Sequence, residues 1–235
     1  MTLEAGKLTA AALPEVESVR VTADLEDGVL ALKPIDIGLA GGHVVGLFTF
    51  DGQKKPLASH AKLDFRGMRI EKLLGRLPKG AKSAGQIEGH FDLRGQGDSV
   101  ARMLASASGS MEVSMEGGGI SNLLDAKLGL DAGKILRLMV TGDQAIGIHS
   151  AVVAFDFEKG LGKSKTILLD TDQTRTEGTG IIDLRDETVE VLLTPHPKKP
   201  GVFSLNSSIR VHGSIRRPEF SVQQKAEEKQ RKEVR

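Results

Sequence analysis

The sequence predicts a mainly β protein with a few short α-helices, and three observations lead to this fold class. Apolar and polar residues alternate with period two over most of the chain, which sends successive side chains to opposite faces of a sheet. Glycine is unusually frequent, at 28 of 235 residues, as expected for many tight turns between short strands. The helical period is confined to three short stretches.

The first half of the chain is a series of strands separated by turn residues. Val19 to Leu32 forms a hairpin around Glu26-Asp27-Gly28. The stretch from His43 to Phe50 is apolar almost throughout, as expected for a strand that is covered on both faces. Further strands are predicted at residues 35–39, 61–65, 87–93 and 110–116. A turn is expected at Gly117-Gly118-Gly119.

Three stretches follow the helical period. A short amphipathic helix is expected from Met68 to Leu77. Asp98 or Ser99 is suited to cap a second helix, which carries Val100, Met103 and Leu104 on one face and stops at Ser108-Gly109. Two short helices are expected between Ile120 and Val140.

The second half of the chain returns to the strand period. Strands are predicted at residues 146–157, 165–172, 174–184, 188–193, 203–212 and 219–222.

Length and composition indicate one globular domain. Hydrophobic residues make up 39% of the 235 residues, which is enough for a substantial core and excludes a disordered protein. The composition does not shift before residue 223, so a single β-rich domain is expected over residues 1–222. Residues 223–235 contain only Ala226 and Val234 as apolar residues, and we expect a charged tail that is disordered or a solvated helix.

The charge balance and the residue types exclude several function classes. Lys and Arg number 32 against 31 Asp and Glu, so no global field attracts a polyanion, and aromatic residues at 3% supply no stacking platform for bases. Nucleic acid is therefore not an expected partner. The absence of Cys excludes disulfides, Cys-ligated zinc, iron–sulfur clusters and thiol nucleophiles.

We expect neither a membrane-spanning helix nor a signal peptide within these residues. No run of about 18 apolar residues is present. The first seven residues lack the basic and apolar regions of a signal peptide. Either the protein is cytosolic or an N-terminal targeting segment lies outside this sequence.

Motifs that carry catalysis or bind metals are weak or missing, so we expect no catalytic residue, metal site or cofactor. Asp170-Thr171-Asp172 has the spacing of a metal–nucleotide motif, but a strand that ends in a turn explains it without a metal. The six His residues show no metal-binding spacing, and no G-x-S-x-G elbow is present. Gly117-Gly118-Gly119 lacks the Lys-Ser/Thr of a phosphate-binding loop.

The order of these features resembles the C-terminal region of the AsmA family of bacterial envelope proteins. The features follow one another as in that family: a strand, Gly95-Gln96-Gly97, a capped helix, a glycine, an alternating strand, a triple glycine, a pair of helices and a long meander. The matching segments within residues 16–222 are 25–52, 85–89, 93–99, 104–110, 117–120, 168–171, 178–184 and 211–220. Relatives commonly carry a Cys near Ser150, and whether Ser150 replaces a native Cys stays open. The family's N-terminal membrane anchor does not lie in this sequence.

The resemblance implies a long, curved, largely antiparallel and amphipathic sheet that is flanked by helices and forms a groove. It also implies a non-enzymatic periplasmic protein, anchored in the inner membrane at full length, that serves outer-membrane assembly and carries phospholipid acyl chains between the two membranes. The alternative is a structural or interaction module whose sheet is fully covered and which binds another envelope protein.

Twelve apolar strand residues are candidates for lining such a groove. A covered core would place the same residues in the same way, because burial favours apolar side chains in either case. The candidates are Leu30, Leu32, Val45, Leu47, Phe65, Phe91, Ile167, Leu169, Phe203, Leu205, Ile209 and Val211.

Overall fold

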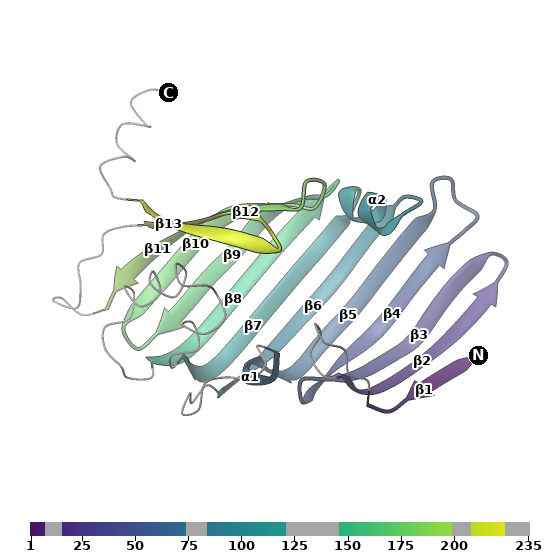
Figure 1. The fold of residues 1–235 in the computed structure, drawn as a ribbon, viewed down its shortest axis with the longest axis horizontal. Coiled ribbons are helices and arrows are strands. Elements are labelled where there is room, and N and C mark those ends of the chain that lie inside the picture. The colour runs from purple at the N-terminus through teal and green to yellow at the C-terminus, as the bar shows by residue number, and fades with distance from the viewer. Residues whose placement is uncertain (8–15, 74–83, 121–145, 199–207, 224–235) are drawn as a thin grey trace, which may run out of the picture.

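The described part of the chain forms one antiparallel sheet of 13 strands in sequence order (Figure 1). The computed structural model describes residues 1–7, 16–73, 84–120, 146–198 and 208–223. The strands are β1 (Thr2–Ala5), β2 (Val16–Glu26), β3 (Val29–Leu39), β4 (Gly42–Asp51), β5 (Ala58–Arg69), β6 (Ala84–Gln96), β7 (Ser108–Ile120), β8 (Ile146–Glu158), β9 (Leu161–Thr171), β10 (Thr174–Asp183), β11 (Thr188–Pro197), β12 (Ser208–Ser214) and β13 (Arg217–Gln223). The predicted fold class, mainly β with few helices, is confirmed.

Two-residue turns set the register of several hairpins. Asp27-Gly28, Ala40-Gly41 and Lys159-Gly160 all have positive φ angles, between 47° and 80°. Two successive residues in this region make the turn whose twist matches that of the flanking strands. Each turn therefore fixes which residues of its two strands pair, and so which side chains share a face.

The register sorts the side chains into two faces. Directly paired residues of an antiparallel sheet point to the same side. One row of such partners runs from β2 to β9 through Val19, Ile37, Val44, Phe65, Gly89, Val113, Val153 and Ile167. We name the side that carries this row the apolar face and the opposite side the polar face.

Two short helices, α1 (Ile70–Leu73) and α2 (Val100–Ala105), lie at the ends of the strands. Ser99 is the N-cap of α2, and its hydroxyl accepts a hydrogen bond from the Arg102 amide at 3.3 Å. Of the two predicted caps, Asp98 and Ser99, the structure has Ser99. The helix packs against β6 above the apolar face, where a Cβ on Gly95 would lie 2.3 Å from the Met103 carbonyl oxygen. No helix among the described residues is long and apolar enough to cross a membrane.

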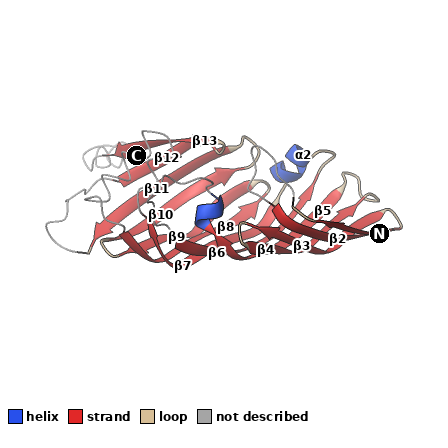
Figure 2. Ribbon diagram, turned by 60° about the horizontal axis from the view of Figure 1, so that its bottom comes forward, coloured by secondary structure: helices blue, strands red, loops and turns tan. Residues whose placement is uncertain are grey.

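The sheet is a single layer that curves toward the side of α2. Figure 2 shows β12 and β13 rising on that side at one end of the sheet. In the described ranges each strand packs mainly on its sequence neighbours, and no large side chain falls below 2% exposure. A two-layered domain of this size would bury many large side chains completely.

Two local predictions were wrong because of irregularities in the ladder. Gly117 and Gly118, with φ angles of 67° and 125°, form an irregular step inside β7 instead of a turn. The strand then continues, and Ile120 pairs with Ile146, so Ile120 does not begin a helix. Met68 lies in β5 opposite Ile87, and the helix expected from Met68 begins two residues later. The short edge strand β1 was not predicted.

Several sequence predictions lie outside the described residues. They concern the C-terminal part of the first helix at residues 74–77, the helices at residues 121–140, the start of the strand at residues 203–207, and the tail from residue 224.

We expect Gly95→Ala to lower the free energy of unfolding by about 1–3 kcal/mol, because the added methyl group would collide with a backbone oxygen that cannot turn away. Urea unfolding followed by circular dichroism measures the change. Gly6→Ala is the matched control, since nothing lies within 4 Å of the Cβ it would gain. Equal stability of the two variants would contradict this account of how α2 is seated.

Candidate functional site

The apolar face is continuous across the sheet. A second row of direct partners, next to the first, runs from β2 to β9 through Val21, Ile35, Gly46, Leu63, Phe91, Met111, Phe155 and Ser164. The register is irregular between β9 and β10, and two rows of partners continue from β11 to β13. One consists of Leu193, Ile209 and Val222, and the other of Val191, Val211 and Phe220. The apolar surface therefore extends over twelve strands.

No charged side chain interrupts these rows. Throughout the register pairs of the described strands β2 to β13, the positions on the apolar face hold aliphatic, aromatic or Met residues, or Gly, Ala, Ser, Thr and Pro. Two Ser hydroxyls on this face bond to the backbone: Ser59 donates to the Gly95 carbonyl at 3.2 Å, and Ser164 accepts from the Gly180 amide at 2.8 Å. The face thus offers hydrocarbon and little else.

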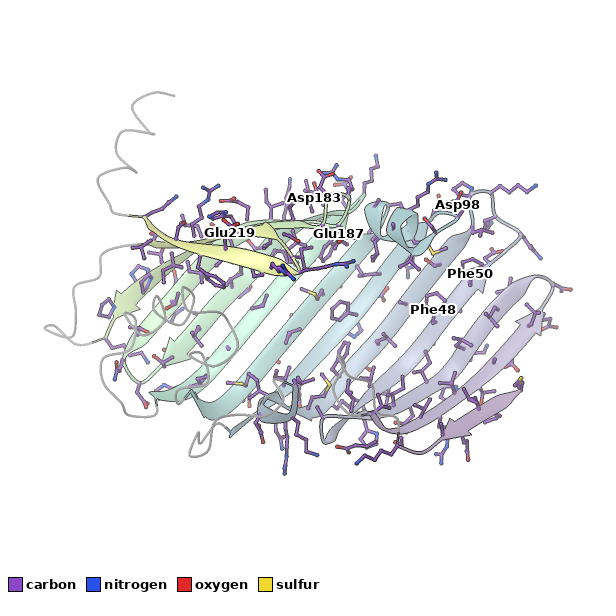
Figure 3. All side chains as sticks on the ribbon, viewed as in Figure 1. Phe48, Phe50, Asp98, Asp183, Glu187 and Glu219 are labelled. Carbon is purple, nitrogen blue, oxygen red and sulfur yellow. The ribbon has the colours of Figure 1, made fainter. Side chains whose placement is uncertain are left out.

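Most of this face stays in partial contact with solvent. Phe155 and Ile209 are buried at 2% and 4% exposure, but Leu63, Phe65 and Phe91 on the central strands are only half-buried. Figure 3 shows Phe48 and Phe50 over the N-terminal half of the sheet. It shows Asp98, Asp183 and Glu187 along the upper rim of the whole sheet. Apart from α1, α2 and the curl of β12 and β13, no described element lies over the face. The described residues therefore present an open apolar surface and not a closed core.

Glycine and aromatic residues alternate on this surface. Gly162 lies opposite Phe157, and a Cβ on Gly162 would be 2.5 Å from the Phe157 ring. Gly89 lies opposite Phe65, whose ring meets that of Phe91 edge-on with 5.3 Å between centroids. Because glycine has no side chain, neighbouring rings can lie along the sheet beside it. At the glycine positions no side chain projects from the sheet.

Comparisons with known proteins identify the family of this chain. The family model described as "AsmA family" matches residues 1–167. This chain belongs to the AsmA family. It is 26% identical over 198 residues to the AsmA family protein YhjG of Escherichia coli (strain K12), an alignment that covers 84% of this chain. The chain spans 29% of the length of that relative. No solved structure matches the chain significantly.

The polar face of this AsmA family chain is joined by hydrogen bonds and ion pairs between strands. Four His residues pair with Asp in this way, and three of these contacts are His43 Nδ1 to Asp36 Oδ1 at 2.8 Å, His60 Nε2 to Asp92 Oδ1 at 2.8 Å, and His90 Nδ1 to Asp64 Oδ1 at 2.7 Å. Glu190 and Arg210 make a bidentate pair between β11 and β12. Within the register pairs of the described strands, the charged side chains thus lie on the face opposite the apolar rows.

The Asp170-Thr171-Asp172 motif belongs to this polar network. Asp172 accepts a hydrogen bond from His149 Nε2 at 2.7 Å and from the Gly147 amide at 2.9 Å, and Asp170 lies 2.7 Å from Lys198 Nζ. Among the described residues, no group of His, Asp and Glu has the arrangement of a metal site. The motif closes the end of β9, and its carboxylates already have protein partners.

The predicted groove residues divide into three groups. The apolar face carries eight of the twelve: Leu30, Leu32, Phe65, Phe91, Ile167, Leu169, Ile209 and Val211. Val45 and Leu47 lie on the polar face, because Val45 pairs with Asp36 and Asp64 and Leu47 pairs with Lys62. Phe203 and Leu205 lie outside the described residues.

Sequence reasoning missed several members of the apolar face. They include Phe48, Phe50, Leu63, Leu93, Met111, Val113, Val153 and Phe155. For Phe48 and Phe50, the sequence of β4 contains a signal. The polar residues His43 and Thr49 share one parity with Val45 and Leu47, which leaves Phe48 and Phe50 on the other face.

Ser150 lies on the polar face, where it pairs with Glu116 and Asp170. A residue at this position is therefore turned away from the apolar rows.

The hydrogen bond from His60 holds the pKa of Asp92 below its ordinary value, against a smaller opposing effect of desolvation. The unfolded chain therefore takes up a proton at Asp92 more readily than the folded chain. The stabilisation is present above about pH 4, the ordinary pKa of Asp, and is lost as the pH falls through the lower folded value.

We expect Asp92→Asn to reduce the acid-induced loss of stability between roughly pH 5 and pH 2 by up to about 1 kcal/mol, because the pair is partly exposed. Urea titrations at a series of pH values measure it. His60→Gln should have the same effect, and the double variant should add nothing further. Additive effects of the two substitutions would show that the pair is not the cause.

Proposed function

We propose that this chain is a non-enzymatic, periplasmic part of an AsmA-like envelope protein that binds phospholipid acyl chains along its apolar face. The full-length protein would be anchored in the inner membrane and serve outer-membrane assembly by carrying lipid between the membranes. The observation that supports this most directly is the continuous, uncharged and half-exposed apolar surface over twelve strands.

The dimensions of the surface suit hydrocarbon chains. Twelve strands about 4.8 Å apart span about 50 Å. The hydrocarbon core of a bilayer is about 30 Å thick and holds two acyl chains end to end, so one chain of about 15 Å would cover about three strands. The surface is therefore long enough for several acyl chains placed end to end across the strands.

The proposed mechanism is passive. Water leaves the apolar face and the acyl chain when they meet, and the gain is about 25 cal/mol for each Å² of apolar surface removed from water. No covalent step and no cofactor is involved. A large unpartnered apolar surface is uncommon on a soluble protein and marks a site for lipid or protein.

A second candidate function is interaction with another envelope protein. It is favoured by α2, which exposes Val100 at 73% and Leu104 at 41% on the side turned away from the sheet. A protein that bound this helix would lie outside the apolar face.

Adjacent identical residues on opposite faces provide matched variants. Leu168 pairs with Val152 and Glu177 on the polar face, whereas Leu169 pairs with Ala151 and Thr176 on the apolar face, and both leucines are half-buried. The same substitution at the two positions adds the same charge to opposite sides of one strand.

We expect Leu169→Asp to weaken lipid binding roughly tenfold to a hundredfold, which corresponds to the contribution of about 1.5–3 kcal/mol from one buried Leu side chain. Leu168→Asp should bind lipid as the unaltered protein does. Gentle purification from a Gram-negative host, native mass spectrometry and organic extraction measure the lipid bound per protein, with thermal unfolding as the check on folding. Absence of lipid from the unaltered protein, while a known lipid carrier retains it, would refute the proposal and favour the interaction module.

A further inference from the structure

One rim of the sheet carries a compact group of exposed apolar and basic side chains. The β4–β5 loop, α2 and the β8–β9 turn follow one another along this rim (Figure 1). Backbone hydrogen bonds join them: the Gly97 amide donates to the Leu57 carbonyl at 2.9 Å, and the Gly160 amide donates to the Ala107 carbonyl at 2.8 Å. We name this part of the rim the α2 patch, which consists of residues 52–57, 97–107 and 159–160.

The apolar part of the α2 patch is the outward side of the helix. Val100 and Leu104 are four residues apart, so they lie on the same side of α2, and they are exposed at 73% and 41%. The helix is seated against β6, where the backbone of Met103 lies directly over Gly95. This close contact fixes the orientation of the helix, so the two aliphatic side chains are held in solvent.

The basic part of the α2 patch is a set of lysines on both sides of the helix. Lys54 and Lys55 lie in the β4–β5 loop and Lys159 in the β8–β9 turn, and all three are exposed. None of them makes an ion pair with a described residue. Asp98 is the only acidic residue in the sequence of the patch, and it is paired with Arg102 at 2.6 Å. The three lysines therefore keep their charge for a partner.

Most acidic residues near the α2 patch point to the other side of the sheet. The register places Glu26, Asp51 and Glu158, which end strands at this rim, on the polar face, whereas α2 lies above the apolar face. Asp27 in the β2–β3 turn is the remaining acidic residue beside the patch. Farther along the rim, residues 183–187 and 214–217 carry three arginines and three acidic residues, which balance one another. The side of the rim at which α2 lies is therefore net positive.

The α2 patch suits a membrane surface better than a folded protein. Specific protein interfaces are enriched in aromatic side chains and bury about 800 Å² on each partner. The patch has no aromatic residue in its sequence, and its strongly exposed apolar side chains are two aliphatic ones on a short helix. Exposed aliphatic side chains flanked by basic residues are typical of segments that lie in the interface of an anionic membrane.

We infer that the α2 patch docks on the surface of an anionic lipid membrane. Val100 and Leu104 enter the head-group region, and Lys54, Lys55 and Lys159 face the lipid phosphates. The aliphatic side chains leave water, while the ammonium groups stay at the level of the phosphates. This goes beyond the proposed function, because the contact lies at the strand ends and requires no acyl chain on the apolar face.

The experiment mixes the chain with vesicles of dioleoyl phosphatidylcholine, with or without dioleoyl phosphatidylglycerol as about one third of the lipid. Flotation in a density gradient separates bound from free protein. We expect about tenfold tighter binding to the vesicles that contain phosphatidylglycerol, since each basic side chain near an anionic surface contributes about fivefold. Most of this difference should disappear between about 0.05 M and 0.5 M salt, because exposed charges are screened.

Charge variants test the basic part of the patch. Lys54→Gln combined with Lys55→Gln should weaken binding to the anionic vesicles about tenfold or more. Lys62→Gln combined with Lys165→Gln is the matched control, because it removes the same charge from exposed positions in the middle of β5 and β9. The control should bind the vesicles as the unaltered chain does.

A second pair of variants tests the apolar part. Val100→Asp should weaken binding to the same vesicles about tenfold, because a carboxylate replaces a side chain that enters the membrane. An acid in the first turn suits the helix, so α2 should still form. Ile181→Asp is the control, since Ile181 is exposed at 42% on the polar face, where it pairs with Lys163 and Glu190.

The outcomes separate this inference from the proposed function. No binding to either kind of vesicle, or equal binding to both, would overturn the inference and favour a protein partner for α2. Equal losses in the patch variants and their controls would overturn it as well. Leu169→Asp should lose its bound lipid and still float with anionic vesicles. Bound lipid without vesicle docking would overturn only the inference, and vesicle docking without bound lipid would overturn only the proposed function.

Discussion

The register of the antiparallel ladder is the constraint on which the rest of this structure depends. A slip of one residue at any turn would send the apolar side chains of every later strand to the polar face. The two-residue turns at Asp27-Gly28, Ala40-Gly41 and Lys159-Gly160 prevent such a slip at three hairpins. The apolar face is therefore a property of the turns as much as of the strands.

Register shifts keep the apolar side chains on one face at positions where the sequence departs from period-two alternation. Leu32 and Ile35 are three residues apart, and simple alternation would put them on opposite faces. The register shifts between them, so Leu32 pairs with Phe48 and Ile35 with Gly46 on the apolar face. The same happens between Phe65 and Met68 in β5. Such bulges insert one extra residue in one strand and keep the following side chains in place.

This explains which parts of the fold and the site could be predicted from the sequence. Period-two alternation and turn residues predicted nearly every strand, and Ser99 predicted the cap of α2, because these are local effects. The face of Val45 and Leu47 was not predicted, since β4 is apolar at both parities and only pairing with Asp64 and Lys62 identifies their side. Whether the apolar face is open could not be predicted either. An alternating strand has the same sequence pattern when its apolar side packs on a second layer and when it faces solvent.

The separation of charge from hydrocarbon also bears on movement of a ligand. With 32 basic and 31 acidic residues, the chain is nearly neutral, yet the register keeps the charged members of its paired strands off the apolar rows. A charged anchor on that face would create one deep minimum and hold a lipid there. On an uncharged surface of repeated aliphatic and aromatic side chains, successive positions give similar contacts and differ little in free energy. Under the proposed function, a lipid bound by its chains alone would shift from strand to strand without a step that breaks an ion pair, as the proposed passive carriage requires.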